Sequence, residues 1–242
     1  MRVVKILTTL LLFSLAFSQP CVVYISGIGC PHCAKVDPVL LKNALEGKVI
    51  VIEYEIYRKP ENSKIALNYW QKYNVPSYSM GIPFIFFTSS DYLVGDTPIL
   101  QNLDNYLVKY NSSECLLLDG EKPFNEINLN SLPGKPAIWL KDKIIVKGDS
   151  YLSNEIIKKI FEDFESLKNL LKEDSEKCFE YSYGKQCFSQ AYLLNDWKIY
   201  LLSENQQAEN YKERNYFQII LVAVLVVLSI FIYLFLKRKI KK

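Results

Sequence analysis

Residues 21–33 read Cys-Val-Val-Tyr-Ile-Ser-Gly-Ile-Gly-Cys-Pro-His-Cys, and this stretch decides the fold. Its first five residues are apolar and β-branched, which predicts a short buried strand. A glycine-rich turn follows at 26–29, and from Cys30 the apolar spacing becomes helical until Gly47. The sequence therefore predicts a Cys-x-x-Cys pair where a buried strand turns into a helix.

The position at the start of a helix gives the pair its chemistry. Backbone N–H groups in a first helical turn have no partner within the helix, and the helix dipole there favours negative charge. A thiol at this end is stabilised as a thiolate, so we expect Cys30 to be the outermost residue and the nucleophile. Cys33 lies one turn inward and can close a disulfide with Cys30.

His32 is the only histidine of the chain, and it lies between the two cysteines. Its ring can donate a hydrogen bond to the Cys30 thiolate or, when protonated, stabilise it by charge. Both effects stabilise the reduced pair relative to its disulfide. The sequence therefore predicts a pair that hands its disulfide on, which is an oxidant.

A zinc site is the main alternative for a Cys-x-x-Cys pair. Structural zinc takes four ligands, usually from a second close pair of Cys or His residues. The other cysteines are isolated or nine residues apart, and no second histidine exists. We therefore expect a redox pair that uses no metal and no cofactor.

Strand and helix patterns alternate as far as residue 110. We predict strands at 49–56, 84–87 and 92–94 and helices at 61–73 and 98–110. Helices connect the first two strands, so these are parallel, whereas a short turn makes the last two an antiparallel hairpin. This order of elements predicts an α/β fold.

Residues 21–110 resemble the thioredoxin superfamily. The strand, turn, Cys-x-x-Cys and helix match its active site, and Pro38 matches the proline that kinks its first helix. Gly81-Ile82-Pro83 matches its Gly-Ile-Pro, and Val94-Gly95 matches the end of its last strand. The resemblance implies a thioredoxin-like three-layer fold, with a catalytic domain at 19–111.

The resemblance also implies roles for individual residues. The proline of the Gly-Ile-Pro motif follows a cis peptide bond in this superfamily and faces the cysteines, and the residue before it presents its backbone to a substrate strand. The substrate-binding position is then Ile82. The catalytic positions are Cys30, Pro31, His32, Cys33 and Pro83.

Three features depart from the superfamily. Tyr24 stands where thioredoxin has a buried aspartate that assists the inner thiol, Gly29 replaces a tryptophan, and residues 76–79 look like an insertion. The group that handles the Cys33 proton is therefore open. Two carboxylates in the second strand, Glu53 and Glu55, are candidates between which the sequence does not choose.

The chain partly repeats itself after the first domain. The pattern of residues 81–96 has an echo at 134–149, and a helix is expected to follow each copy. We predict a partial ββα repeat at 112–165, with chance similarity of two hairpins as the alternative. Apolar spacing then predicts a long helix to about residue 177 and a helical hairpin extension at 166–202.

The chain has six cysteines, and an even number favours disulfides in an oxidising compartment. In the thioredoxin-like fold the first strand starts opposite the active site, and the last helix returns to that end. This implies a Cys21–Cys115 bridge, with two free buried thiols as the alternative. Cys178 and Cys187 flank Gly184 and are expected to bridge the turn of the helical hairpin.

Both ends of the chain carry apolar segments. Residues 1–18 have the order of a secretory signal peptide. Residues 217–236 are 20 residues without charge, enough to cross a bilayer, and five cations follow at 237–242. With a polar stalk at 203–216, this predicts a single-pass protein of the cell membrane that contacts lipid through 217–236, with an N-terminal domain outside and a cytoplasmic tail.

The net charge of +3 does not indicate nucleic acid binding. Two positive charges belong to the signal segment and five to the basic tail, which leaves 22 Lys and Arg against 26 Asp and Glu, or −4, in between. The basic tail is typical of a topology determinant. We expect no nucleic acid partner.

These observations together predict a membrane-anchored thiol–disulfide oxidoreductase. It would form or isomerise disulfides in exported proteins, and a membrane redox partner would reset its cysteine pair. A thioredoxin-like reductase is one alternative. A non-catalytic, client-binding subunit of a membrane complex is the other.

Overall fold

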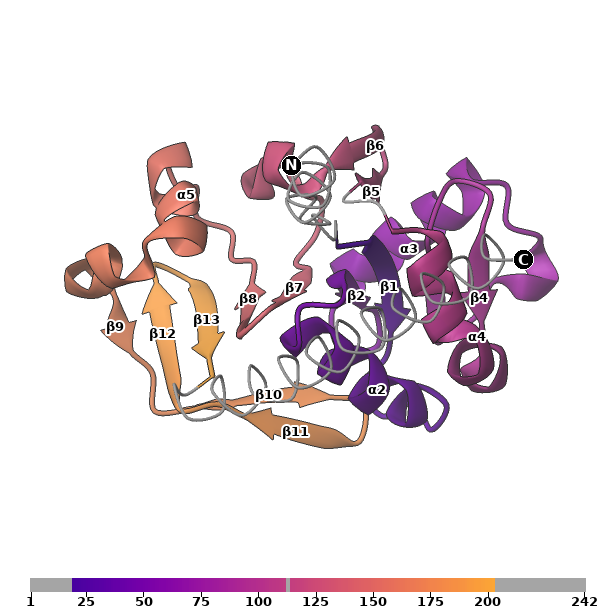
Figure 1. Cartoon of the computed structure of the whole chain (residues 1–242), viewed down its shortest axis with the longest axis horizontal. Helices are drawn as coiled ribbons and strands as arrows, with labels where there is room; N and C mark the ends of the chain where they lie inside the picture. Colours follow the sequence, from indigo (N-terminus) through magenta and orange to yellow (C-terminus); the bar gives the residue numbers. More distant parts are fainter. Residues whose placement is uncertain (1–18, 112–113, 203–242) are drawn as a thin grey trace, which may run out of the picture. The chain divides into compact units, whose positions relative to one another are not determined.

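A mixed sheet of nine strands organises residues 19–111 and 114–202, the part of the chain that the computed structural model describes (Figure 1). The strand order is β4-β3-β1-β2-β7-β8-β13-β12-β9. The strands are β1 Cys21–Ser26, β2 Ile50–Glu55, β3 Phe84–Phe86, β4 Tyr92–Val94, β7 Ala137–Leu140, β8 Lys143–Val146, β9 Lys172–Glu173, β12 Gln190–Leu194 and β13 Trp197–Leu201. β1 and β2 are parallel, and the other neighbours pair antiparallel.

Helices and two separate hairpins complete the described residues. The α-helices are α2 Cys33–Leu45, α3 Pro60–Lys72, α4 Asp96–Lys109 and α5 Asn154–Glu162. The 3-10 helices are Ser77–Ser79, Phe124–Glu126, Leu129–Ser131 and Phe164–Leu170. One hairpin pairs β5 Glu114–Leu117 with β6 Gly120–Pro123, and the other pairs β10 Cys178–Tyr181 with β11 Gly184–Cys187.

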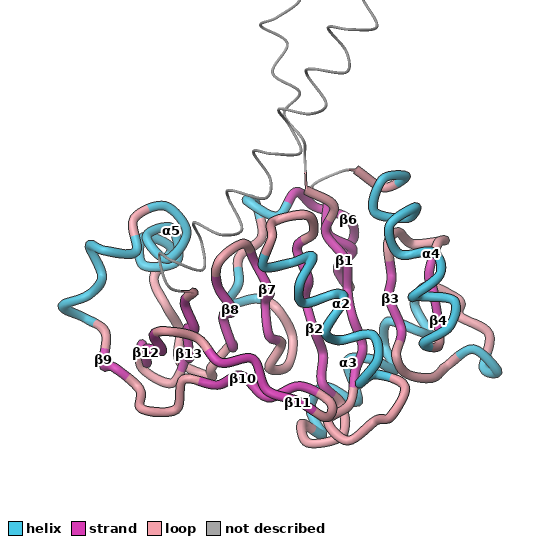
Figure 2. The backbone as a smooth tube through the Cα atoms, turned by 60° about the horizontal axis from the view of Figure 1, so that its bottom comes forward, coloured by secondary structure: helices cyan, strands magenta, loops and turns pink. Residues whose placement is uncertain are grey.

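The predicted element order as far as residue 110 is confirmed, from β1 through α4. Residues of a strand point alternately to the two faces of its sheet. Tyr24 of β1 donates to Asp37 of α2, whereas Val23 and Ile25 belong to the core that contains Tyr69 of α3. The helices α2 and α3 therefore cover opposite faces of the sheet around β1 (Figure 2).

The sheet continues into the second half of the chain through β7. This strand pairs antiparallel with β2, with Ile52 opposite Ile138, and β8 follows it as a hairpin. The strands and the helix of the predicted ββα segment are thus present as β7, β8 and α5. The β5–β6 hairpin that precedes them is an addition which the sequence did not indicate.

The predicted helical extension at 166–202 is wrong. The long helix ends at Glu162, because Asp163 leaves helical geometry at φ −149° and ψ 65°. Residues 172–201 then form five strands instead of a helical hairpin. Asn195, at φ 56°, makes a two-residue turn that pairs β12 with β13, and Trp197 and Ile199 are buried on alternate positions.

The predicted fold class and the predicted localisation both depended on a membrane-spanning helix, and the structure contradicts that part of the two predictions. Within 19–111 and 114–202, every helix is too short or too polar to cross a bilayer. That finding contradicts the predicted single-pass architecture and the cell-membrane localisation. The segments 1–18, 203–216, 217–236 and 237–242, on which those predictions were placed, lie outside the described residues. The fold that the structure supports is mixed α/β with a large, mostly antiparallel sheet.

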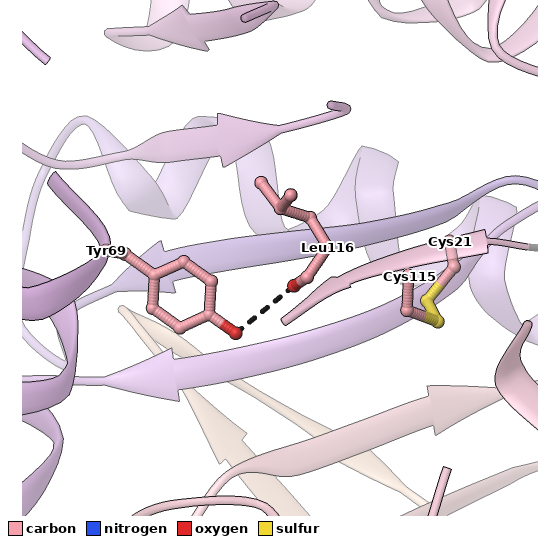
Figure 3. The surroundings of a disulfide bond; sticks show 4 residues. All are labelled: Cys21, Tyr69, Cys115 and Leu116. Atoms are coloured by element: carbon pink, nitrogen blue, oxygen red, sulfur yellow. Dashed lines mark hydrogen bonds between the residues drawn. A yellow bond between two sulfur atoms is a disulfide. The ribbon is translucent and has the colours of Figure 1, made fainter. Parts of the chain in front are cut away.

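Both predicted disulfides are confirmed. Cys21 and Cys115 join the start of β1 to β5 with a Cα–Cα distance of 4.7 Å. Next to this bridge, the Tyr69 hydroxyl donates to the Leu116 carbonyl at 3.2 Å (Figure 3). Cys178 and Cys187 are opposite residues of the β10–β11 hairpin, so their bridge closes a strand pair and not a helical turn.

Candidate functional site

Cys30 and Cys33 are the cysteines without a disulfide among the described residues. The turn between β1 and α2 needs a glycine at Gly29, where φ is +96°. The Cys30 amide donates to the Gly27 carbonyl at 3.0 Å, which closes the turn. Helix α2 begins at Cys33, and the Cys33 amide donates to Cys30 Sγ at 3.2 Å. An amide of the first helical turn, which has no acceptor within the helix, thus donates to the outer sulfur.

Both cysteines are buried, including Cys30, which was expected to be the outermost of the pair. Cys30 is 3% exposed and Cys33 is 0% exposed. Burial raises the pKa of the Cys33 thiol well above its usual range, and a hydrogen bond to Cys30 and the charges of Cys30 and Asp37 add to the effect. Burial thus opposes ionisation of the inner thiol, and the amide hydrogen bond is made to the outer sulfur, Cys30 Sγ.

His32 does not make the predicted contact. Its ring is largely exposed, and its Nδ1 lies 3.2 Å from Asp96 Oδ1, at the start of α4. Lys35 Nζ lies 2.5 Å from the other oxygen of the same carboxylate. The hydrogen bond from Lys35, followed by that from His32, lowers the pKa of Asp96 to about 2. The ring thus pairs with an anion beside the motif, and the neighbouring Pro31 is also exposed.

Strand register brings Ile82 and Pro83 to the cysteine turn. The Ile82–Pro83 peptide bond is cis, as predicted. β3 runs antiparallel to β1 with Phe84 opposite Ile25, so the two preceding residues continue alongside the turn that leads to Cys30. The Gly95 amide donates to the Pro83 carbonyl at 2.9 Å, which fixes the other side of this segment.

The turn before Cys30 passes close to Ile82 and Tyr57 at Gly27. A Cβ atom at Gly27 would lie 2.7 Å from Ile82 Cδ1 and 2.8 Å from Tyr57 Cγ. We expect Gly27→Ala to displace both side chains and to lower the free energy of unfolding by about 1–3 kcal/mol. Urea unfolding measures this, with Gly81→Ala as the control because a Cβ there meets nothing within 4 Å. Equal stability of the two variants would contradict the close approach.

A buried carboxylate that the sequence analysis missed lies behind the cysteine pair. Asp37 is 0% exposed and follows Cys33 by one turn on the buried face of α2. Its Oδ1 accepts from the Tyr24 hydroxyl, and its Oδ2 accepts from the Ser182 amide at 3.0 Å and the Ser182 hydroxyl at 2.5 Å. Burial raises the pKa of Asp37, although the hydrogen bonds from Ser182 and Tyr24 oppose that shift.

The two carboxylates that the sequence proposed as proton acceptors differ in environment. Glu53 is buried and accepts from Ser26 Oγ at 2.6 Å and from Trp139 Nε1 at 3.2 Å. Burial, followed by the charge of Asp37, raises its pKa to about 8. Glu55 instead accepts from backbone amides, those of Ile28 at 2.9 Å and Tyr57 at 2.8 Å among them. Glu55 therefore links the loop after β1 to the loop after β2 through these hydrogen bonds. Asp37 is the carboxylate whose charge contributes to the raised pKa of Cys33.

A pattern in the sequence could have identified Asp37 as a buried acid, whereas no pattern indicates that Ser182 belongs to the site. An aspartate on the apolar stripe of Cys33, Val36 and Leu40 indicates a buried acid, because a solvated one would lie on the opposite face. Ser182 reaches the site from 145 residues farther along the chain. Neither residue spacing nor composition predicts the contact between Ser182 and Asp37.

Comparison of the chain with protein-family models, with curated proteins and with solved structures gave no match. The resemblance to the thioredoxin superfamily therefore stays a prediction. Within the part of the chain that the structure describes, no group of three or more His, Cys, Asp or Glu side chains could hold a metal ion.

Proposed function

We propose that this chain is a protein thiol–disulfide oxidoreductase, in which Cys30 is the nucleophile and Cys33 the resolving thiol. The observation that carries the proposal is the Cys33 amide at 3.2 Å from Cys30 Sγ, at the first turn of α2. Amides and the dipole at a helix start stabilise a thiolate. The resemblance to the thioredoxin superfamily agrees with this assignment, and the substrates would be proteins with thiols or disulfides.

In the disulfide-forming direction, the oxidised pair starts as a Cys30–Cys33 bond. A client thiolate attacks Cys30 Sγ, the Cys30–Cys33 bond breaks, and Cys33 leaves with the electron pair and takes a proton. A second client thiolate then attacks the client sulfur of the mixed disulfide, forms the client disulfide and releases Cys30 as a thiolate. The client loses two electrons and the pair gains them.

Access to Cys30 would come through a client segment laid along the cis-proline loop. Cys30 is 3% exposed, so the rigid surface of a folded client protein would make little contact with its sulfur. Ile82 and Pro83 flank the turn before Cys30, and the exposed ring of Tyr57 lies over the same turn. An extended client strand along Ile82 would carry its sulfur to the pair, as the resemblance implies for this position.

The proposal is tested with the full chain in an RNase-refolding assay and an insulin-reduction assay. We expect Cys30→Ser to reduce both activities to the uncatalysed level, because the attacking sulfur is gone. Cys33→Ala is expected to accumulate a mixed disulfide on Cys30, visible by mass spectrometry, because the resolving thiol is missing. Unchanged activity of Cys30→Ser would reject the enzyme and favour a client-binding module.

The direction of exchange is tested separately by the reduction potential of the Cys30–Cys33 pair. We expect a value above that of thioredoxin, about −270 mV, because the Cys33 amide at the start of α2 donates to Cys30 Sγ and would stabilise a thiolate there. Equilibration with glutathione buffers measures it. A potential at or below that of thioredoxin would favour a reductase.

A further inference from the structure

The β10–β11 hairpin comes late in the chain but lies beside α2, whose first residue is Cys33 (Figures 1 and 2). Its two-residue turn is Ser182–Tyr183, between the paired residues Tyr181 and Gly184. Ser182 is 5% exposed, whereas the neighbouring Tyr183 is 65% exposed. A serine buried at the tip of a hairpin needs an explanation, because such turns normally point into solvent.

Three hydrogen bonds of Ser182 supply that explanation. Its carbonyl accepts from the Gly29 amide at 2.7 Å, directly before Cys30. Its amide and hydroxyl donate to Asp37 Oδ2 at 3.0 Å and 2.5 Å, one helical turn after Cys33. One residue thus holds both the loop that presents Cys30 and the carboxylate behind Cys33.

The rest of the hairpin keeps this tip in place. The Cys178–Cys187 disulfide closes its base. Phe179 is buried, with its ring edge-on to Trp139 at a centroid distance of 6.1 Å, and Arg58 forms an ion pair with Glu180 at 3.1 Å. The hairpin is therefore attached to the sheet and to the loop after β2, and not only through Ser182.

We infer that Ser182 is a positioning residue of the thiol site and that the hairpin, stapled by Cys178–Cys187, is a required part of that site. The kinetic side of this inference rests on the proposed function. Ser182 stabilises the ionised form of Asp37, which is then able to accept the Cys33 proton. Without the two Ser182 donors, Tyr24 is the remaining hydrogen-bond donor to the carboxylate among the described residues.

The proton transfer belongs to the step that resolves a mixed disulfide. The Cys33 thiol gives its proton to the Asp37 carboxylate, and the Cys33 sulfur attacks Cys30 Sγ. The Cys30–Cys33 bond forms, the bond from Cys30 to the client breaks, and the client leaves as a thiolate. The two cysteines are oxidised and the client sulfurs are reduced. In the disulfide-forming direction the same proton returns from Asp37 to Cys33.

The titratable groups around Asp37 come from three elements. Tyr24 on β1 donates to it, Glu53 on β2 has its pKa raised in part by the Asp37 charge, and Cys33 lies on the same helix as Asp37. On the exposed side of that helix, His32 and Lys35 pair with Asp96 of α4. Ser182 donates to Asp37 from the hairpin and does not ionise. Replacing its hydroxyl therefore removes a hydrogen bond to Asp37 without removing a titratable group.

The test compares the full chain with Ser182→Ala, following the ¹³C resonance of the Asp37 carboxyl group against pH. Asp37→Asn assigns the resonance. We expect its midpoint to move to higher pH, because a donor to the ionised form is lost. Turnover should fall about ten-fold on the acid side and recover at alkaline pH, the size expected for one hydrogen bond to a charged group.

Three further variants separate positioning from simple loss of structure. Ser189→Ala is the matched control, because its hydroxyl donates to the Leu201 carbonyl and not to the site. Ser182→Thr keeps the hydroxyl and should restore the wild-type midpoint. The double variant Cys178→Ala, Cys187→Ala should move the midpoint in the same direction as Ser182→Ala, because the tip loses its staple.

The outcomes distinguish this inference from the proposed function. An unchanged Asp37 titration in Ser182→Ala, or an equal shift in Ser189→Ala, overturns the inference even in an active enzyme. A shifted titration in a protein without exchange activity rejects the oxidoreductase but keeps the Ser182–Asp37 coupling. A shifted titration whose acid-side rate loss follows it supports both.

Discussion

Removing the Cys21–Cys115 bridge is expected to lower the free energy of unfolding by about 4–5 kcal/mol. The two residues are 94 positions apart, so the bridge closes a long loop and removes much of the conformational entropy of the unfolded chain. Both sulfurs also lie in the core, at 3% and 0% exposure, so alanines there leave packing space unfilled. Guanidinium unfolding of Cys21→Ala, Cys115→Ala under non-reducing conditions measures the loss.

The Cys178–Cys187 bridge is the matched control, because it closes a much shorter loop. Cys178 and Cys187 are nine positions apart, and the same loop-entropy relation gives about 2–3 kcal/mol for Cys178→Ala, Cys187→Ala. The double variants should therefore differ by about two-fold in lost stability. A larger loss from the short loop would show that hairpin packing, and not chain entropy, dominates these bridges.

The residues that decide the first half of the fold act locally, and that half could be predicted. Apolar residues 21–25 make β1, Gly29 supplies the positive φ of the turn, and Cys30 ends up beside a helix start. The cis bond before Pro83 and the pairing of Cys21 with Cys115 followed from the resemblance. Each of these features depends on neighbours close in the chain or on one recognisable pattern.

The second half could not be predicted, because its apolar spacing suits two structures. Residues 188–202 place apolar side chains at helical intervals, and Trp197 and Ile199 also alternate as a strand requires. The choice is made by the turn at Asn195 and by pairing of β13 with β8, which is a contact between distant segments. Tertiary pairing of this kind overrides local propensity.

His32 shows how proximity in sequence can mislead about a site. The ring lies between two cysteines in the chain, yet its partner in space is Asp96, at the first residue of α4. The Cys33 amide occupies the donor position at Cys30 Sγ instead. The support for the proposed Cys30 thiolate thus comes from backbone geometry, which a strand-to-helix pattern predicts better than the identity of one side chain.

The stability of the protein is expected to fall as pH rises from about 4.5 to about 8, because of Glu53. Burial raises the pKa of this carboxyl from 4.5 to about 8, so the folded protein holds a proton that the unfolded chain releases in that window. Stability then decreases with pH, by on the order of 5 kcal/mol over the whole window, and Glu53 contributes no further change below 4.5 or above 8.

Glu53→Gln is expected to flatten this dependence, as urea unfolding at a series of pH values would show. Glutamine has the same shape and stays neutral, its oxygen can accept from Trp139 Nε1, and its amide can donate to Ser26 Oγ. Burial also raises the pKa of Asp37, and this residue is present in both proteins, so the difference between the two slopes reports the replacement of Glu53. Glu61→Gln on the exposed face of α3 should leave the slope unchanged. If wild type and Glu53→Gln have equal slopes, Glu53 is ionised in the folded protein at neutral pH, and a second buried charge would then face Asp37 behind the cysteines.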